Sequence, residues 1–144
     1  MKFGTTIMII GFLALGLLAT GNMPFMIGGE KGSGKVTTSE RKVSDFHGIV
    51  VSSGIDLVLT QGNSESCAVV TDDNLQDKIV TEVNNGILEI YVDGSLRNTK
   101  ELEVLVTFKA LDRLAASGGS DIEGKGQINF KTLDVSSSGG SDIN

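Results

Sequence analysis

The chain of 144 residues carries 18 acidic and 12 basic side chains, which gives a formal net charge of −6 at pH 7. No stretch gathers the lysines and arginines into a cluster that could neutralise a row of phosphates, so the sequence predicts no nucleic-acid partner. One proline, no tryptophan and 19 glycines suit many short strands joined by glycine turns.

The first 21 residues have the layout of a secretory signal peptide. Lys2 is a lone positive charge, residues 7–19 form an apolar run, and the run closes on the small residues of a cleavage site, Ala-Thr-Gly. The run is shorter than the roughly 20 apolar residues that a membrane span needs. A retained membrane anchor over residues 3–27 is the alternative interpretation.

Cleavage after residue 21 would remove Lys2 as the only charged side chain and leave a net charge of −7. The sequence therefore predicts an acidic protein exported to the periplasm, the cell envelope or the extracellular space. Residues 22–35, NMPFMIGGEKGSGK, read as a flexible glycine-rich linker. Ordered structure is expected to begin near Val36, and residues 36–144 have the size of one domain.

From Val36 onward the chain reads as β-structure. Apolar and polar residues alternate with a period of two, which is typical of strands with one buried face. Asn84-Asn85-Gly86 separates two such runs and predicts a hairpin turn. Residues 73–80 are the one helix candidate and read as a single helical turn. The predicted strands cover residues 50–60, 67–71, 79–83, 87–92 and 102–108.

A repeat marks the end of the chain. Residues 116–122 read ASGGSDI and residues 137–143 read SSGGSDI, while FKALD at 108–112 is matched by FKTLD at 130–134. A looser copy, VSSGIDL, lies at 51–57, a distance of 65 that corresponds to about three units of the repeat. A period in the low twenties is typical of solenoids. We therefore predict an all-β solenoid with glycine-rich corners, in which aspartate points outward and isoleucine or leucine points inward.

The chain stops at Asn144, one residue after the second full copy, without the cap that normally shields the last coil of a solenoid. The prediction is an incomplete solenoid over 36–144, truncated at the C-terminus. A gene fragment and a chain completed by assembly are the alternatives.

Four blocks of the sequence resemble the autotransporter-adhesin head GIN domain, in the same order and spacing over residues 35–144. They are FHGIVVSSGIDLVLTQG at 46–62, DNL at 73–75, NGILEI at 85–90, and the SGGSD repeats. The resemblance implies a right-handed parallel β-helix-like fold in exported bacterial proteins, with a role in adhesion or surface structure. It supplies no catalytic, cofactor or metal residue to carry over.

Asp56, Asp121 and Asp142 occupy the same position in their repeats, so stacked coils would bring Asp121 and Asp142 about 4.8 Å apart at the backbone. One interpretation is a ladder of carboxylates that binds Ca²⁺. The interpretation that we favour is structural, with each aspartate accepting hydrogen bonds from N–H groups of the turn.

The remaining reactive side chains suggest no active site. Asp72 and Asp73 sit in a turn-like segment where their side chains should diverge, and His47 lies just before a strand with no Cys or Ser close by. Cys67, the only cysteine, reads as a small buried apolar residue. Serines that recur beside the glycine corners read as turn formers; these are Ser52, Ser117 and Ser138.

The sequence thus predicts a non-enzymatic surface module that binds an envelope glycan or an envelope protein, without cofactor or metal. A β-helix enzyme acting on polysaccharide is the main alternative, but the arginines are scattered at 41, 97 and 113 and do not share one strand face. A scaffold protein of the cell envelope is a third possibility.

Overall fold

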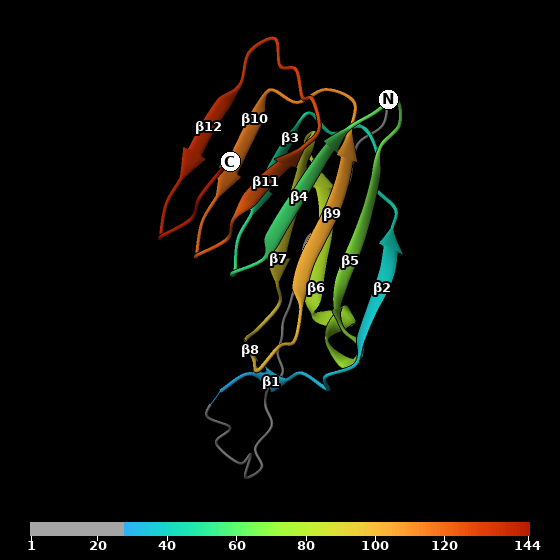
Figure 1. Ribbon diagram of the computed structural model, residues 1–144, viewed down its shortest axis with the longest axis vertical. Coiled ribbons are helices and arrows are strands. Elements are labelled where there is room, and N and C mark those ends of the chain that lie inside the picture. Colours follow the sequence, from blue (N-terminus) through green and yellow to red (C-terminus); the bar gives the residue numbers. More distant parts are fainter. Residues whose placement is uncertain (1–27) are drawn as a thin grey trace.

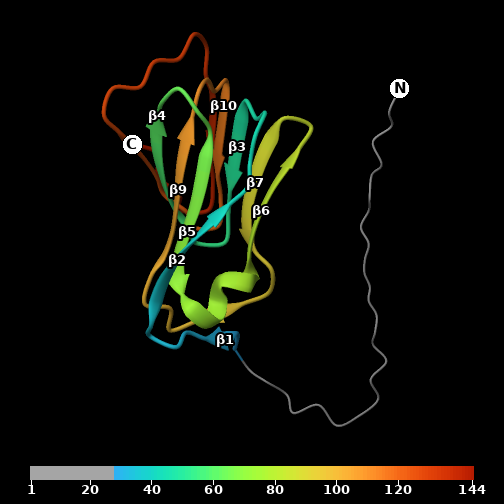
Figure 2. The same cartoon turned by 90° about the vertical axis from the view of Figure 1, so that its right-hand side faces the viewer.

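The computed structural model describes residues 28–144, so the predicted signal peptide, the alternative anchor and residues 22–27 of the predicted linker lie outside the described residues. Two five-stranded sheets face each other and enclose one apolar core, as Figures 1 and 2 show. No helix within the described range is long and apolar enough to cross a membrane. The all-β prediction is confirmed.

The first sheet has the strand order β12-β10-β3-β7-β6, and the second has the order β11-β4-β9-β5-β2. A two-stranded ribbon of β1 and β8 lies at the end of the molecule that carries the helical turn (Figure 1). The elements are β1 (Glu30–Lys31), β2 (Val36–Arg41), β3 (Gly48–Val51), β4 (Asp56–Gln61), β5 (Ser66–Asp72), the 3-10 helix η2 (Asp73–Lys78), β6 (Ile79–Asn84), β7 (Ile87–Val92), β8 (Leu96–Arg97), β9 (Leu102–Phe108), β10 (Arg113–Ala116), β11 (Ile122–Lys125) and β12 (Asp134–Ser137).

Four coils stack in parallel through the molecule, where a coil is a strand of the first sheet followed by one of the second. Their spatial order is β7 with β9, β3 with β4, β10 with β11, and finally β12 with Ile143. The coil of β3 and β4 lies between two coils that come later in the chain. Spatial order and chain order therefore differ.

A fully parallel solenoid is not what the structure shows. Strands β2, β5 and β9 pair antiparallel, and β6 pairs antiparallel with β7, so both sheets are mixed. For β6 and β7 the cause is the turn between them: Asn85 and Gly86 take φ angles of 52° and 80°, the left-handed pair that a two-residue hairpin requires. Such a turn reverses the chain and cannot feed a parallel coil.

The 65-residue offset in the sequence is the register of a direct strand pair. Val51 lies opposite Ala116, and Leu57 lies opposite Ile122. The distance of 65 therefore does not correspond to three stacked units of the repeat, because residues 66–108 form β5 to β9. The 21-residue offset is also a direct pairing, of Ala116 with Ser137.

The inward-facing residues of neighbouring coils form apolar columns. Leu88, Ile49 and Leu114 make one column in the first sheet, and each is at most 3% exposed. Val104, Leu57 and Ile122 make another in the second sheet. Each fully buried side chain of this size contributes about 1.5–3 kcal/mol. One core thus joins the hairpin part of the chain to its repeats.

The narrow corners between the sheets need glycine, as predicted. Gly118 and Gly119 take φ angles of 65° and 79°, and Gly139 repeats this conformation in the next coil at 68°. A Cβ on Gly139 would lie 3.0 Å from the backbone nitrogen of Gly118. Glycine therefore supplies both the left-handed backbone and the close approach of one coil to the next.

Ordered structure begins earlier than Val36. Residues 30–31 already form β1, and the backbone nitrogen of Gly34 donates a 2.7 Å hydrogen bond to Oδ2 of Asp72. Oδ1 of Asp72 accepts from Lys100 N at 2.8 Å and from Glu101 N at 3.4 Å. Asp72 is fully buried and holds residues 28–35 against the sheet; of the solvated or capping role that the sequence predicts, the structure shows the capping one, in which the carboxylate accepts backbone N–H groups.

Acidification should weaken this attachment. Burial alone would raise the pKa of Asp72, but the backbone N–H groups of Gly34, Lys100 and Glu101 outweigh it and hold the pKa below 3.8. The ionised group therefore contributes stability that is present above that value and is lost as pH falls through the lowered pKa. We expect Asp72→Asn to be less stable than the wild type at neutral pH and to lose less stability between about pH 5 and about pH 2. Urea unfolding at several pH values measures both; parallel curves for the two proteins would contradict the assignment.

Candidate binding groove at the wide corner

A groove opens where the chain passes from the second sheet back to the first. It has a volume of about 560 Å³, within the range of small-ligand sites. We call it the wide-corner groove and define it by its lining residues, which are His47, Gln61, Lys109, Ala110, Leu111, Asp112, Asn129, Phe130, Lys131 and Thr132.

The repeat builds this groove from two copies of one motif. FKALD and FKTLD place Lys109 and Lys131 at equivalent positions, and both line the groove. The rings of Phe108 and Phe130 stack at a centroid distance of 6.0 Å with an angle of 5° between them. The two bends are therefore fixed to each other by an aromatic contact beneath the groove.

Gln61 ties the same two bends together by hydrogen bonds. Its Nε2 donates to the carbonyl oxygens of Lys109 and Asn129 at 3.1 and 3.2 Å, and its Oε1 accepts from Asn129 N at 2.8 Å. A side-chain amide that uses both of its ends in this way holds the backbone on either side of it. The groove is thus a preformed feature of the fold.

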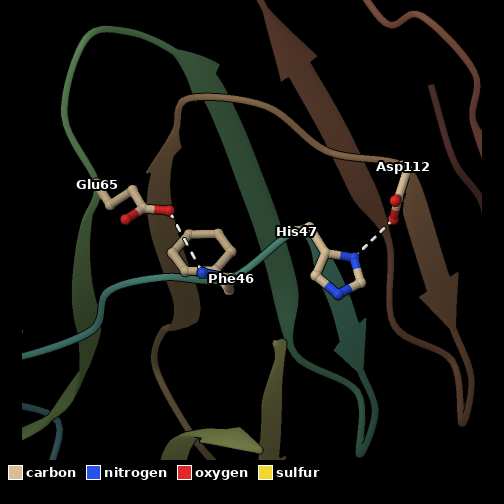
Figure 3. A network of polar contacts seen from close by, with 4 residues as sticks. All are labelled: Phe46, His47, Glu65 and Asp112. Carbon is tan, nitrogen blue, oxygen red and sulfur yellow. Dashed lines mark hydrogen bonds and ion pairs between the residues drawn. The ribbon is translucent and has the colours of Figure 1, made fainter. Parts of the chain in front are cut away.

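His47 and Asp112 form the wall nearest the first sheet. Nδ1 of His47 donates to Oδ1 of Asp112 over 2.9 Å, and both side chains are 57% exposed (Figure 3). The other edge of the imidazole lies against Gly86, where an added Cβ would be 2.6 Å from the ring. The backbone nitrogen of His47 also donates to Gly86 O at 2.7 Å. His47 therefore joins the start of three strands, β7, β3 and β10.

Glu65 supports the segment just before His47. Its carboxylate accepts from the backbone nitrogen of Asp45 at 2.9 Å and from that of Phe46 at 3.4 Å, and Figure 3 draws the second of these contacts. Its side chain is 8% exposed and lies 4.0 Å from Nζ of Lys109. One wall of the groove is thereby anchored from the second sheet.

The pairing of His47 with Asp112 is the contact that the sequence analysis missed. The two residues are 65 positions apart, which is the same offset that aligns β3 with β10. Taken as the register of a direct strand pairing, this offset predicts the contact between His47 and Asp112. A histidine with one carboxylate lacks the nucleophile of an acyl-transfer site. In residues 28–144 no group of three or more His, Cys, Asp or Glu side chains is placed to hold a metal.

The corner aspartates do come together, on the opposite side of the stack. Ile122 bridges to Ile143, and the backbone nitrogen of Asp142 donates to Oδ1 of Asp121 at 3.0 Å. Asp121 thus accepts a turn N–H, as the structural interpretation predicts. Glu103 lies opposite Asp56 and extends the acidic column. Burial, then the charges of Asp121 and Glu101, raise the pKa of Asp56.

We expect millimolar calcium to leave the melting temperature unchanged. The side chain of Asp121 is already engaged by a backbone donor, and in the described part of the chain no three or more acidic, His or Cys side chains are placed to hold a metal ion. Differential scanning calorimetry with and without calcium measures this. A melting temperature that climbs with calcium concentration would instead show binding to the folded state.

The structure also places Cys67 and the corner serines, and Cys67 is buried as the sequence predicts. Burial raises the pKa of its thiol to about 11, so the thiolate that reacts is scarce at neutral pH. The corner serines form a backbone ladder: Ser117 N donates to Val51 O and Ser138 N donates to Ala116 O, each at 3.0 Å.

These observations define a class of protein: a two-sheet β-protein with stacked parallel coils and an exposed polar groove at one corner. Residues 45–144 match the family described as "Putative auto-transporter adhesin, head GIN domain". The chain belongs to this family. No match was found among curated proteins.

Solved structures of similar fold carry related names. A "putative adhesin" from Parabacteroides merdae is 21% identical with a TM-score of 0.68, covering 74% of this chain and 45% of its own. A "putative adhesin" from Bacteroides fragilis is 22% identical with a TM-score of 0.73, covering 79% of this chain and 54% of its own. A "putative lipid binding protein" from Parabacteroides distasonis is 24% identical with a TM-score of 0.67, covering 74% and 48%. The chain spans about half the length of these proteins, and at these identities they show the fold alone.

Proposed function

We propose that this chain is an exported, non-catalytic adhesion module of the bacterial surface and that its wide-corner groove contacts an acidic surface glycan. Membership of an adhesin family supports the adhesive role. The observation that carries the site is the groove itself, in which the repeat sets Lys109 and Lys131 beside the amide and hydroxyl groups of Asn129 and Thr132. The ammonium group of Lys131 suits a carboxylate, as does that of the half-exposed Lys109 beside its 4.0 Å contact with Glu65, and the polar groups suit sugar hydroxyls.

Binding of the full chain to immobilised polygalacturonate, with dextran as the neutral comparison, tests this proposal. We expect saturable binding to the acidic polymer that weakens with salt and is lost in Lys131→Glu and Lys109→Glu. Lys35→Glu, at an exposed lysine outside the groove, is the matched control and should bind like the wild type. Equal binding by all four proteins, or no binding, would remove the groove from the proposal.

The same polymer separates adhesion from catalysis. An adhesion module leaves the length of polygalacturonate unchanged, whereas a polysaccharide-degrading enzyme shortens it and lowers its viscosity. Turnover by the full chain would overturn the non-catalytic role. If neither binding nor turnover occurs, and a defined envelope protein co-purifies in a pull-down that Lys131→Glu abolishes, the scaffold interpretation takes its place.

Export rests on the signal-peptide layout of residues 1–21. We propose cleavage after Gly21, so the mature protein should begin at Asn22. Intact-mass measurement on protein from a bacterial periplasmic or surface fraction tests this. A full-length mass in the membrane fraction would support the anchor over residues 3–27 instead.

The right-handed β-helix implied by the family resemblance is also a proposal, limited to the parallel coils. Strands β3, β4, β10, β11 and β12 support it through their parallel pairing. An experimental structure that shows these coils wound in the opposite sense would overturn it.

A further inference from the structure

The turn between β6 and β7 carries a pair of residues that can react with each other. Asn85 is followed by Gly86, and no other asparagine of the 144-residue chain precedes a glycine. The side-chain amide of an asparagine can be attacked by the backbone nitrogen of the next residue, and glycine hinders this attack least because it has no side chain. The reaction is intramolecular, so the two groups need only turn toward each other.

The structure leaves both reacting groups accessible. Asn85 is exposed at the tip of the β6–β7 hairpin (Figure 2), so water reaches its side-chain amide. The backbone nitrogen of Gly86 donates no backbone hydrogen bond within residues 28–144. Its carbonyl oxygen, in contrast, accepts from His47 N at 2.7 Å and from Gly48 N at 3.3 Å. The nucleophile of the reaction is therefore free, while the carbonyl group of the same residue is held.

We propose that Asn85 is a site of spontaneous deamidation in the folded protein and that the isoaspartyl product loosens the wall of the wide-corner groove. The Gly86 nitrogen loses its proton and bonds to Cγ of Asn85, while the bond from Cγ to the side-chain nitrogen breaks and ammonia leaves. Water then opens the cyclic succinimide at either of its carbonyl carbons. Opening at one carbon restores a normal backbone with aspartate. Opening at the other gives isoaspartate, whose main chain runs through Cβ and Cγ.

The isoaspartyl product does not fit the turn. The two-residue hairpin depends on left-handed φ angles, which are 52° at Asn85 and 80° at Gly86. A main chain lengthened by a methylene group cannot close this hairpin in the same register. The carbonyl oxygen of Gly86 then moves away from the backbone nitrogens of His47 and Gly48, which it holds at the start of β3.

The loss reaches the groove through His47. Its imidazole lies against Gly86, 2.6 Å from the position that a Cβ would take, and its Nδ1 is 2.9 Å from Oδ1 of Asp112. Both His47 and Asp112 line the wide-corner groove. A displaced Gly86 therefore removes the support of the imidazole and of the backbone beneath it. The aspartate product, in contrast, changes only the charge at the tip of the turn.

Storage of the full chain in warm, mildly alkaline buffer, followed by peptide mapping with tandem mass spectrometry, tests the site. We expect Asn85 to convert to a mixture of isoaspartate and aspartate. Asn98 is the control within the same sample, because it is exposed and has the same φ of 52° but is followed by Thr99. The β-branched side chain of Thr99 restricts the approach to its backbone nitrogen, so Asn98 should keep its amide. Conversion at Asn85 no faster than at Asn98, or conversion only after unfolding in urea, would overturn the proposal.

A matched variant separates the effect of the longer backbone from that of the charge. The isoaspartyl form, isolated by chromatography, should unfold at a lower urea concentration than freshly purified Asn85→Asp, which carries the same charge on a normal backbone. Equal urea midpoints would show that the turn tolerates the longer main chain, and the groove wall would then not be loosened. We also expect the isoaspartyl form to bind polygalacturonate more weakly, which rests on the proposed function. The mass and urea measurements involve no glycan, so failure here and failure of the adhesion proposal are distinguishable.

Discussion

Replacing Phe108 with alanine should lower the free energy of unfolding by about 3–5 kcal/mol. Phe108 is the largest fully buried side chain in the described residues, and it stacks on Phe130 across the two repeat bends. Its removal takes away apolar burial and leaves a cavity that the fixed bends cannot fill by collapse. Urea unfolding followed by far-UV circular dichroism measures the loss.

Phe130→Ala is the matched control for this prediction. Phe130 holds the equivalent repeat position but is only partly buried, so its truncation should cost clearly less. Because the two rings touch, the double variant should lose less than the sum of the single losses, by about 0.5–1.5 kcal/mol. Equal losses at both positions would mean that Phe108 does not anchor the core.

The local elements could be predicted because their signals are local. The strands over 87–92 and 102–108 have the predicted bounds, and Asn85-Gly86 forms the predicted turn. The corner of SGGSD could be predicted from the backbone that consecutive glycines allow. The predicted strand over 50–60 is broken by a narrow corner after Val51, where Ser53 and Gly54 take φ angles of 68° and 71°. The alignment of VSSGIDL with the SGGSD repeats pointed to a corner here, but Ser53 stands where the repeat has Gly118 and adopts a conformation that serine rarely takes, so the strand pattern of residues 50–60 concealed it.

The arrangement of the coils could not be predicted, because it depends on which strand edge each coil meets. The repeat distance of 65 residues is the sequence separation both of paired residues in β3 and β10 and of His47 and Asp112. In a simple solenoid, coils that are adjacent in space are adjacent in the chain. Here β5 to β9 intervene in sequence yet lie on the other side of the β3–β4 coil. Only the register of the strand pairs distinguishes a simple solenoid from a stack in which the spatial order of the coils differs from their order in the chain.

Gly86→Ala should destabilise the protein more than its backbone angle alone explains. Gly86 has a φ of 80°, and placing alanine in the left-handed region costs about 1–2 kcal/mol. The new methyl group would also meet the His47 ring, which must rotate away and give up its hydrogen bond to Asp112. A hydrogen bond of this kind contributes about 0.5–1.5 kcal/mol, so we expect a total loss of about 2–3 kcal/mol. Chemical unfolding at neutral pH measures it.

Gly119→Ala isolates the backbone contribution. Gly119 has nearly the same φ, 79°, but an added Cβ would meet nothing within 4 Å. Its loss should therefore stay near the about 1–2 kcal/mol of the left-handed conformation. If Gly86→Ala lowers the free energy of unfolding no more than Gly119→Ala does, the imidazole does not depend on the space above Gly86. The His47 side chain would then not hold the wall of the wide-corner groove in place.

A third variant decides between a clash and a general weakening of the hairpin. His47→Ala removes the ring, so adding Gly86→Ala to it should cost only the backbone contribution of about 1–2 kcal/mol. The two substitutions together should then destabilise the protein by less than the sum of their separate effects. Additive losses would show that the turn of β6 and β7 is weakened without involving His47. The joining of β7, β3 and β10 at the wide-corner groove would then rest on the backbone bonds from His47 to Gly86 and from Asp112 to His47.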